Sequence, residues 1–377
     1  MRRGVWMVSV LLLGLSGARA EDIGGAGKPA DAERPLVQLA LLLDTSNSMD
    51  GMIQQAKTQL WSIVNEFVTA KRAGQRPVVQ VALYRYGTPA LGAENGYIKQ
   101  LLPLTDDLDK VSDELFRLTT HGGDEYCGWV IQNATNDLAW STSNKDYKAI
   151  FIAGNETFAQ GKVDFREACK AAITKGIVVN TIHCEGAEDT FWDEAARLGD
   201  GRFMHIDQNR QVVQIQAPQD AEIATLSGDL NKTYVAYGAR GKDGAANQAA
   251  QETNSASLGA ANLSTRAYTK ANAQYRNGGW DLVDAAKEKE FKLEDVKEAE
   301  LPTEMQKMTA EERKAYVETK AKEREKLQAR INDLVKQRTD FVAAEEKKQA
   351  EANKDTLGNQ VRAAVREQAE KREFKFK

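Results

Sequence analysis

The stretch LVQLALLLDTSNS, residues 36–48, decides how the rest of this chain is organised. Its nearly continuous apolar run predicts a strand buried on both faces, as in the centre of a parallel sheet. The run ends at Asp44, Ser46 and Ser48, and open α/β sheets bind their ligands at the carboxyl ends of such strands. One carboxylate and two hydroxyls suit a small hard cation such as Mg²⁺. The alternative is that these residues form a turn and the N-cap of the next helix.

Further apolar segments alternate with helical patterns after this stretch. The predicted strands are 36–43, 78–84, 97–102, 149–153, 177–183 and 203–206. Strands that alternate with helices predict an α/β fold, here a doubly wound, mostly parallel six-stranded sheet with helices on both faces. A C-terminal helical or coiled-coil region follows the sheet in the sequence.

The Asp-x-Ser-x-Ser pattern after an apolar strand, together with the order of elements over residues 35–235, resembles the von Willebrand factor type A (VWA) domain. The pattern is similar to the metal-ion-dependent adhesion site of that family. The resemblance implies a bound divalent ion, Mg²⁺ or alternatively Mn²⁺ or Ca²⁺. It also implies a protein partner that contributes an acidic side chain to the ion.

Two of the loops that hold the metal in this family differ here. The second loop usually has Thr after a Gly pair, whereas residues 122–123 are followed by Asp124. The third loop usually has a Thr-Asp-Gly triplet, whereas residues 153–155 are Ala-Gly-Asn, followed by Glu156. The carboxylate gained in the second loop thus compensates for the one lost from the third, which makes the site atypical. The resemblance implies these metal ligands: Asp44, Ser46, Ser48, Asp124, Asn155 and Glu156.

The N-terminus predicts export. Residues 1–20 have two early arginines, an apolar core and small residues at the cleavage position, which is typical of a secretory signal peptide. Residues 21–34 read as a flexible lead-in, and no later stretch is long and apolar enough to span a membrane. Removing residues 1–20 takes away three arginines and no acids, so the net charge of −4 becomes −7, which disfavours nucleic-acid binding. We therefore expect a secreted bacterial type of VWA protein, periplasmic or extracellular.

The three cysteines then lie in an oxidising compartment, where one pair and one leftover thiol is the simplest arrangement. We expect a Cys127–Cys184 disulfide, because both residues are predicted near the carboxyl-end face of the sheet. Cys169 lies in a helical pattern among apolar residues and is expected to be a buried thiol.

The C-terminal part of the chain divides into two segments. Residues 236–300 are rich in small and polar residues and predict a linker with short helices, in which Trp280 anchors a turn. Residues 301–377 predict a charged helical tail, which starts with a Thr309–Glu312 capping box. Its apolar seam contains Leu327, Ile331, Leu334 and Phe341, but also Arg324 and Arg338. Because arginines in a seam disfavour a strong homodimer, we expect a monomer whose tail contacts a neighbouring or partner helix. A helix lying on its own protein is the alternative.

These observations leave three classes of function. The first is a metal-dependent binding module, for adhesion or scaffolding, and not an enzyme. The second is an envelope scaffold that acts through the helical tail while the metal site is non-functional. The third is a metal-assisted hydrolase that uses Asp44 and Asp124, although the histidines predict no general base next to the serines.

Overall fold

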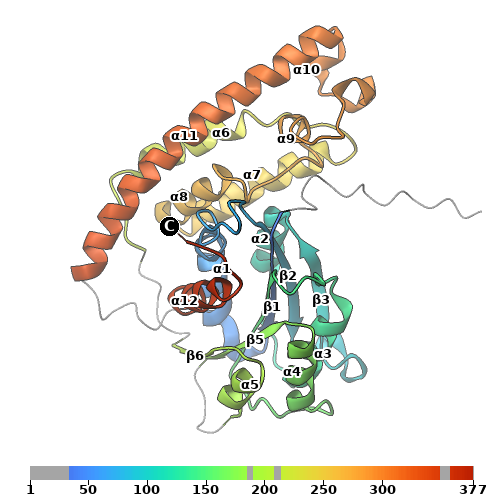
Figure 1. Cartoon of the computed structure of the whole chain (residues 1–377), viewed down its shortest axis with the longest axis vertical. Helices are drawn as coiled ribbons and strands as arrows, with labels where there is room; N and C mark the ends of the chain where they lie inside the picture. Colours follow the sequence, from blue (N-terminus) through green and yellow to red (C-terminus); the bar gives the residue numbers. More distant parts are fainter. Residues whose placement is uncertain (1–33, 185–189, 208–213, 349–356, 377) are drawn as a thin grey trace, which may run out of the picture.

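The computed structural model describes residues 34–184, 190–207, 214–348 and 357–376. The predicted signal peptide and almost all of the lead-in therefore lie outside the described residues. Figure 1 shows a twisted sheet with helices on both faces and a group of helices beyond one end of it. The strands are β1 (Leu36–Asp44), β2 (Val78–Tyr86), β3 (Lys99–Thr105), β4 (Tyr147–Gly154), β5 (Val178–Cys184) and β6 (Phe203–Ile206).

The sheet confirms the predicted six-stranded α/β fold. Its strand order is β3-β2-β1-β4-β5-β6, and every pair is parallel except β2 with β3. The strand order reverses between β1 and β4, and ligands of doubly wound sheets bind at such a point. The strand predicted at 97–102 instead begins at Lys99, because Gly96 and Tyr97 before it have positive φ angles of 66° and 56°.

Alternate residues of the central strands face two separate cores, whereas the edge strand β6 contributes Met204 and Ile206 to only one of them. On β1, Leu39 and Leu43 belong to one core, while Ala40 and Leu42 belong to the other. The first core is covered by α1 (Asp50–Asn65), α2 (Leu108–Arg117) and α12 (Leu357–Glu370). The second core is covered by α3 (Cys127–Asp137), α4 (Phe165–Thr174) and α5 (Trp192–Leu198). The last helix of the chain thus completes the sheet domain.

The two cores overturn the predicted disulfide. Cys127 is part of the core under α3, whereas Cys184 is part of the core on the opposite face of the sheet. The prediction of a Cys127–Cys184 bond is therefore wrong, because the sheet separates the two side chains. Both residues lie near the carboxyl ends of the strands as expected, but the sequence did not show which face each one occupies. Cys169 is buried, as predicted.

The remaining helices form a region beyond the amino ends of the strands (Figure 1). They are α6 (Asp220–Asn231), α7 (Gly241–Ser257), α8 (Ala260–Lys270), α9 (Leu282–Ala285), α10 (Thr303–Gln306) and α11 (Ala310–Lys348). Short 3₁₀ turns are Asn47–Met49, Pro89–Leu91, Ala93–Asn95, Leu293–Asp295 and Glu298–Glu300. No helix within the described ranges is both long and apolar enough to cross a membrane.

The segment predicted as a linker is in fact packed against the sheet domain. Arg266 of α8 is fully buried and pairs with Asp109 of α2 at 2.6 Å. Trp61 of α1 donates its indole N–H to Ser255 of α7 at 3.2 Å. This packing could not be predicted from the sequence, because ion pairs and hydrogen bonds produce no periodic pattern of apolar residues.

The long helix α11 lies on its own protein, as in the alternative interpretation of the seam. Ile331 and Leu334 pack with α6 and α8, and the capping box forms as predicted. The seam arginine Arg324 is buried and bonds both carboxylate oxygens of Asp281, at 2.7 and 3.2 Å. The arginine that disfavours a coiled-coil homodimer in the sequence therefore anchors α11 to the segment around Asp281 in the structure.

Candidate metal centre

Asp44 occupies the last position of β1, between the ends of β2 and β4. It is completely buried, and its Oδ1 accepts the Ser46 N–H at 2.7 Å. The Ser46 hydroxyl donates to Oδ2 of Asp44 at 3.1 Å and lies 3.2 Å from the Ser48 hydroxyl. Although Ser46 stands at the N-cap position of the next turn, its side chain makes no capping hydrogen bond. The hydroxyls thus point into a shared polar cluster, which argues against the capping interpretation.

The third loop joins this cluster through Asn155. The Ser48 hydroxyl donates to Oδ1 of Asn155 at 3.1 Å, so the loops after β1 and β4 meet as the fold predicts. Trp192 donates its indole N–H to the Glu156 carbonyl at 2.8 Å and holds the loop from the α5 side. The Glu156 side chain is exposed, but its charge acts on Asp44.

In the second loop the structure places Asp124 and Glu125 differently. Asp124 is exposed and lies beside the Tyr97 phenol, whose pKa is raised by burial and then by the Asp124 charge. Glu125 is only 4% exposed, and its charge interacts with Asp44. Only one of these two adjacent acids therefore turns inward. The sequence-based ligand set therefore omitted the buried carboxylate of this loop.

Tight backbone packing holds the second loop close to the first. The His121 N–H donates to the Thr45 carbonyl at 2.8 Å. Gly87, at the end of β2, has a φ of +78°, and a Cβ atom there would lie 2.5 Å from Oδ1 of Asp44. Only glycine fits this position, because any side chain would have to displace the central carboxylate.

Burial and mutual repulsion change the acidity of the carboxylates. Burial, and to a smaller extent the Glu156 charge, raises the pKa of Asp44 to about 7, against the lowering effect of the Ser46 hydrogen bonds. Burial, followed by the charges of Asp44 and Glu156, raises the pKa of Glu125 to about 8. A cation in this cluster would favour the ionised form of both groups.

The donor chemistry fits a hard divalent ion. Asp44, Ser46, Ser48 and Asn155 offer carboxylate, hydroxyl and amide oxygens, the ligand types of Mg²⁺, Mn²⁺ and Ca²⁺. Within the part of the chain that the structure describes, no group of three or more His, Cys, Asp and Glu side chains is arranged to hold a metal. An ion here would therefore depend on hydroxyls and water, as Mg²⁺ sites commonly do.

Comparison with known proteins identifies the sheet domain. The family model of the von Willebrand factor type A domain matches residues 38–218. These residues form a VWA domain. Domains of this family generally act as protein-interaction modules. No curated protein matches the chain in sequence.

Solved structures with a similar fold cover about half of the chain. BatB, a conserved hypothetical protein of Bacteroides thetaiotaomicron, is 20% identical over 45% of this chain and 90% of its own, with a TM-score of 0.34. An aerotolerance-related membrane protein of Bacteroides fragilis is 18% identical over 45% and 92% of the two chains, with a TM-score of 0.33. Proximal thread matrix protein 1 of the mussel byssus, solved with zinc in its MIDAS motif, is 14% identical over 46% and 42%, with a TM-score of 0.37.

Proposed function

We propose that this chain is an exported binding module whose VWA domain holds a divalent cation and uses it to recruit an acidic group of a protein partner. The observation that carries the proposal is the hydrogen-bonded line of oxygens from Asp44 through Ser46 and Ser48 to Asn155. Those hydroxyls make no helix cap, and they border a carboxylate whose ionisation is opposed by burial.

Within this proposal the residues have different roles. Asp44, Ser46, Ser48 and Asn155 supply oxygen ligands, directly or through water. Glu125 supplies the second buried negative charge, in place of the acid that the family usually has in its third loop. Glu156 is exposed at the edge of the cluster and contributes negative charge from there. Asp124 is not among the proposed ligands, because its side chain faces Tyr97.

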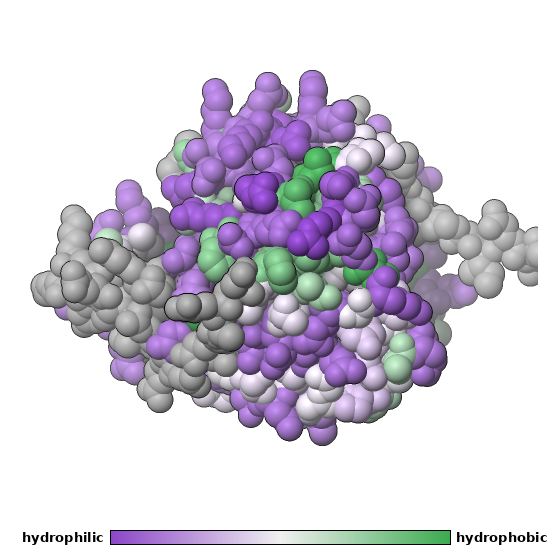
Figure 2. Space-filling view, turned by 90° about the horizontal axis from the view of Figure 1, so that it is seen from below, coloured by the Kyte–Doolittle hydropathy of each residue, from purple (hydrophilic) through white to green (hydrophobic). Residues whose placement is uncertain are grey.

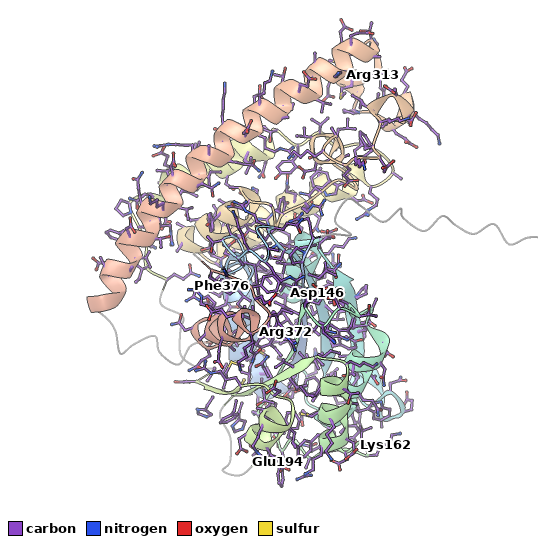
Figure 3. All side chains as sticks on the ribbon, in the orientation of Figure 1. Asp146, Lys162, Glu194, Arg313, Arg372 and Phe376 are labelled. Atoms are coloured by element: carbon purple, nitrogen blue, oxygen red, sulfur yellow. The ribbon has the colours of Figure 1, made fainter. Side chains whose placement is uncertain are left out.

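The arrangement of the molecule favours this function over the alternatives. Figure 3 labels Lys162, which follows β4, and Glu194, which follows β5, at the lower end of the sheet, whereas Asp146, just before β4, lies higher. The helical region is at the upper end, so it leaves the metal centre uncovered. Figure 2 views the lower end and shows a mainly hydrophilic surface with a smaller hydrophobic area near its centre.

The other two functions have less support. A scaffold acting through the tail needs an apolar face to offer, but the seam of α11 is already buried against α6 and α8. The hydrolase hypothesis relied on Asp44 and Asp124 acting together, but Asp44 is buried whereas Asp124 is exposed and lies beside Tyr97.

The test is capture of a partner by the immobilised full-length protein from an extract of the source cell envelope. Capture that requires Mg²⁺, disappears with chelator and is lost in Asp44→Asn supports the proposal. The control is Asp333→Asn, because Asp333 is exposed on α11 and belongs to no site described above. Capture that is equal with and without chelator would assign binding to another surface. N-terminal sequencing of the mature protein tests the predicted cleavage before Glu21.

A further inference from the structure

A second candidate site lies at the opposite end of the molecule from the metal centre. A cavity of about 500 Å³ is lined by Arg34 and Arg76, which precede β1 and β2, and by Arg276, which follows α8. A smaller hollow of about 190 Å³ shares Arg276, Gly278 and Glu288 with it. We name the two together the junction cleft. The larger cavity is within the usual size of small-molecule sites, about 300–1,000 Å³.

Basic groups from separate segments meet in the junction cleft. Arg34 is held in position, because its guanidinium donates to the carbonyls of Arg76 and Pro77, each at 3.1 Å. Asp284, an acid of the lining, is already engaged by Arg324 at 3.0 Å and by Lys287 at 2.9 Å. The other acids of the lining are Glu288 and, in the smaller hollow, Asp106 and Asp107, of which Asp107 pairs with Arg240 at 3.5 Å. Over the two hollows, five basic side chains therefore face four carboxylates.

A buried amide supplies a further donor. Asn277 is 5% exposed and lines the smaller hollow. Its Oδ1 accepts the indole N–H of Trp280 at 3.1 Å, and since an indole nitrogen only donates, this contact determines which way the amide is turned. The Nδ2 group is then directed elsewhere, and it has no hydrogen-bond partner among the residues described. Buried donors of this kind are uncommon and favour a bound acceptor.

We propose that the junction cleft binds a small organic anion. Its phosphate or carboxylate group bonds the guanidinium groups of Arg34, Arg76 and Arg276, and an acceptor oxygen takes the Asn277 amide. Arginine suits both anions because its planar donors match their oxygens in pairs. The site is separate from the metal centre and does not depend on it.

The experiment is isothermal titration of the full chain with inorganic phosphate and, in parallel, with succinate. Chelator is present and chloride keeps the ionic strength constant, so the metal centre and general screening do not contribute. We expect saturable binding of at least one anion, and the arm that saturates identifies a phosphate or a carboxylate ligand. Absence of saturable binding in both arms overturns the proposal.

Variants then locate the binding. Arg276→Gln and Arg76→Gln should each weaken it by roughly tenfold, the effect of one lost charge-assisted contact. Arg117→Gln is the matched control, because that side chain is 68% exposed on α2, away from the cleft lining. If Arg276→Gln fails to fold, Arg76→Gln decides, since Arg76 is exposed and its loss should leave the fold intact. Parent-like affinity in these variants would also overturn the proposal.

Discussion

Replacing Asp44 by Asn should change how the stability of the protein depends on pH. Asp44 is fully buried, and burial followed by the Glu156 charge raises its pKa from 3.8 to about 7. A carboxyl whose pKa is higher in the folded than in the unfolded protein stabilises the fold while it is protonated. That contribution is complete below about pH 4 and is lost as the pH rises through about 7. At about 1.4 kcal/mol per pKa unit, ionised Asp44 lowers the free energy of unfolding by roughly 4 kcal/mol when no cation is bound.

The assay is urea unfolding at pH 5 and pH 8, each with chelator and with Mg²⁺. With chelator present, the free energy of unfolding should be lower at pH 8 than at pH 5, and the ionisation of Asp44 should account for roughly 3 kcal/mol of this difference, given its pKa of about 7 in the folded protein. Mg²⁺ at a hundredfold excess over its Kd should restore about 2.7 kcal/mol at pH 8 in the parent protein. Asp44→Asn has no charge to bury, so its stability should depend less on pH and not on Mg²⁺. The exposed-site control Asp333→Asn should behave as the parent.

Two results would refute this reasoning. Equal stability of the parent in chelator at pH 5 and pH 8 would show that burial does not oppose the ionisation of Asp44. Stabilisation of Asp44→Asn by Mg²⁺ to the same extent as the parent would mean that Asp44 is not the central metal ligand.

Three further predictions follow from burial and pairing. Glu125→Gln should weaken Mg²⁺ binding, measured by calorimetry, more than Asp124→Asn does, because Glu125 is 4% exposed and Asp124 faces Tyr97; the reverse order would restore the sequence-based ligand set. Arg324→Ala should lower the free energy of unfolding by about 3–5 kcal/mol, since its carboxylate partners stay buried, whereas loss of the exposed Arg330 pair should cost under about 1 kcal/mol. Light scattering should give a monomer mass for the parent and for Leu334→Asp, which should melt at a lower temperature; a dimer lost in this variant contradicts the intramolecular packing.

The sheet domain could be predicted because its signals are local. A nearly continuous apolar run needs burial on both faces, and the run at 36–43 therefore predicted the central strand β1 and the position of Asp44. The choice between Asp124 and Glu125 was not local, since it depends on which way a loop turns after it packs. The faces occupied by Cys127 and Cys184 likewise depend on the register of strands and helices far apart in sequence.

The helical region was the least predictable part because polar side chains hold it to the VWA domain. Lys270 of α8 is fully buried and pairs with Glu252 at 2.9 Å, and Glu252 also bonds Arg266 at 3.1 Å. Such pairs leave no hydrophobic stripe in α7 or α8, so composition alone suggested a linker. Arg324 and Arg338 were misleading in a different way. They interrupt the apolar seam of α11 in the sequence, yet in the structure they hold α11 to the rest of the chain, Arg338 through a 2.6 Å contact with Asp220.

This polar packing also limits where the chain can be cut. A protein ending at residue 235 would lose Arg266 and leave Asp109 of α2 buried without its cation, and breaking such a pair typically costs about 3–5 kcal/mol. A protein ending at residue 300 would lose α12, whose Gln368 accepts the Tyr147 hydroxyl at 2.8 Å beside the sheet core. Either truncation would damage the VWA domain itself, so a loss of partner binding would not reveal which part of the chain binds. Point substitutions at the metal centre and at the junction cleft, made in the full chain, separate the two sites.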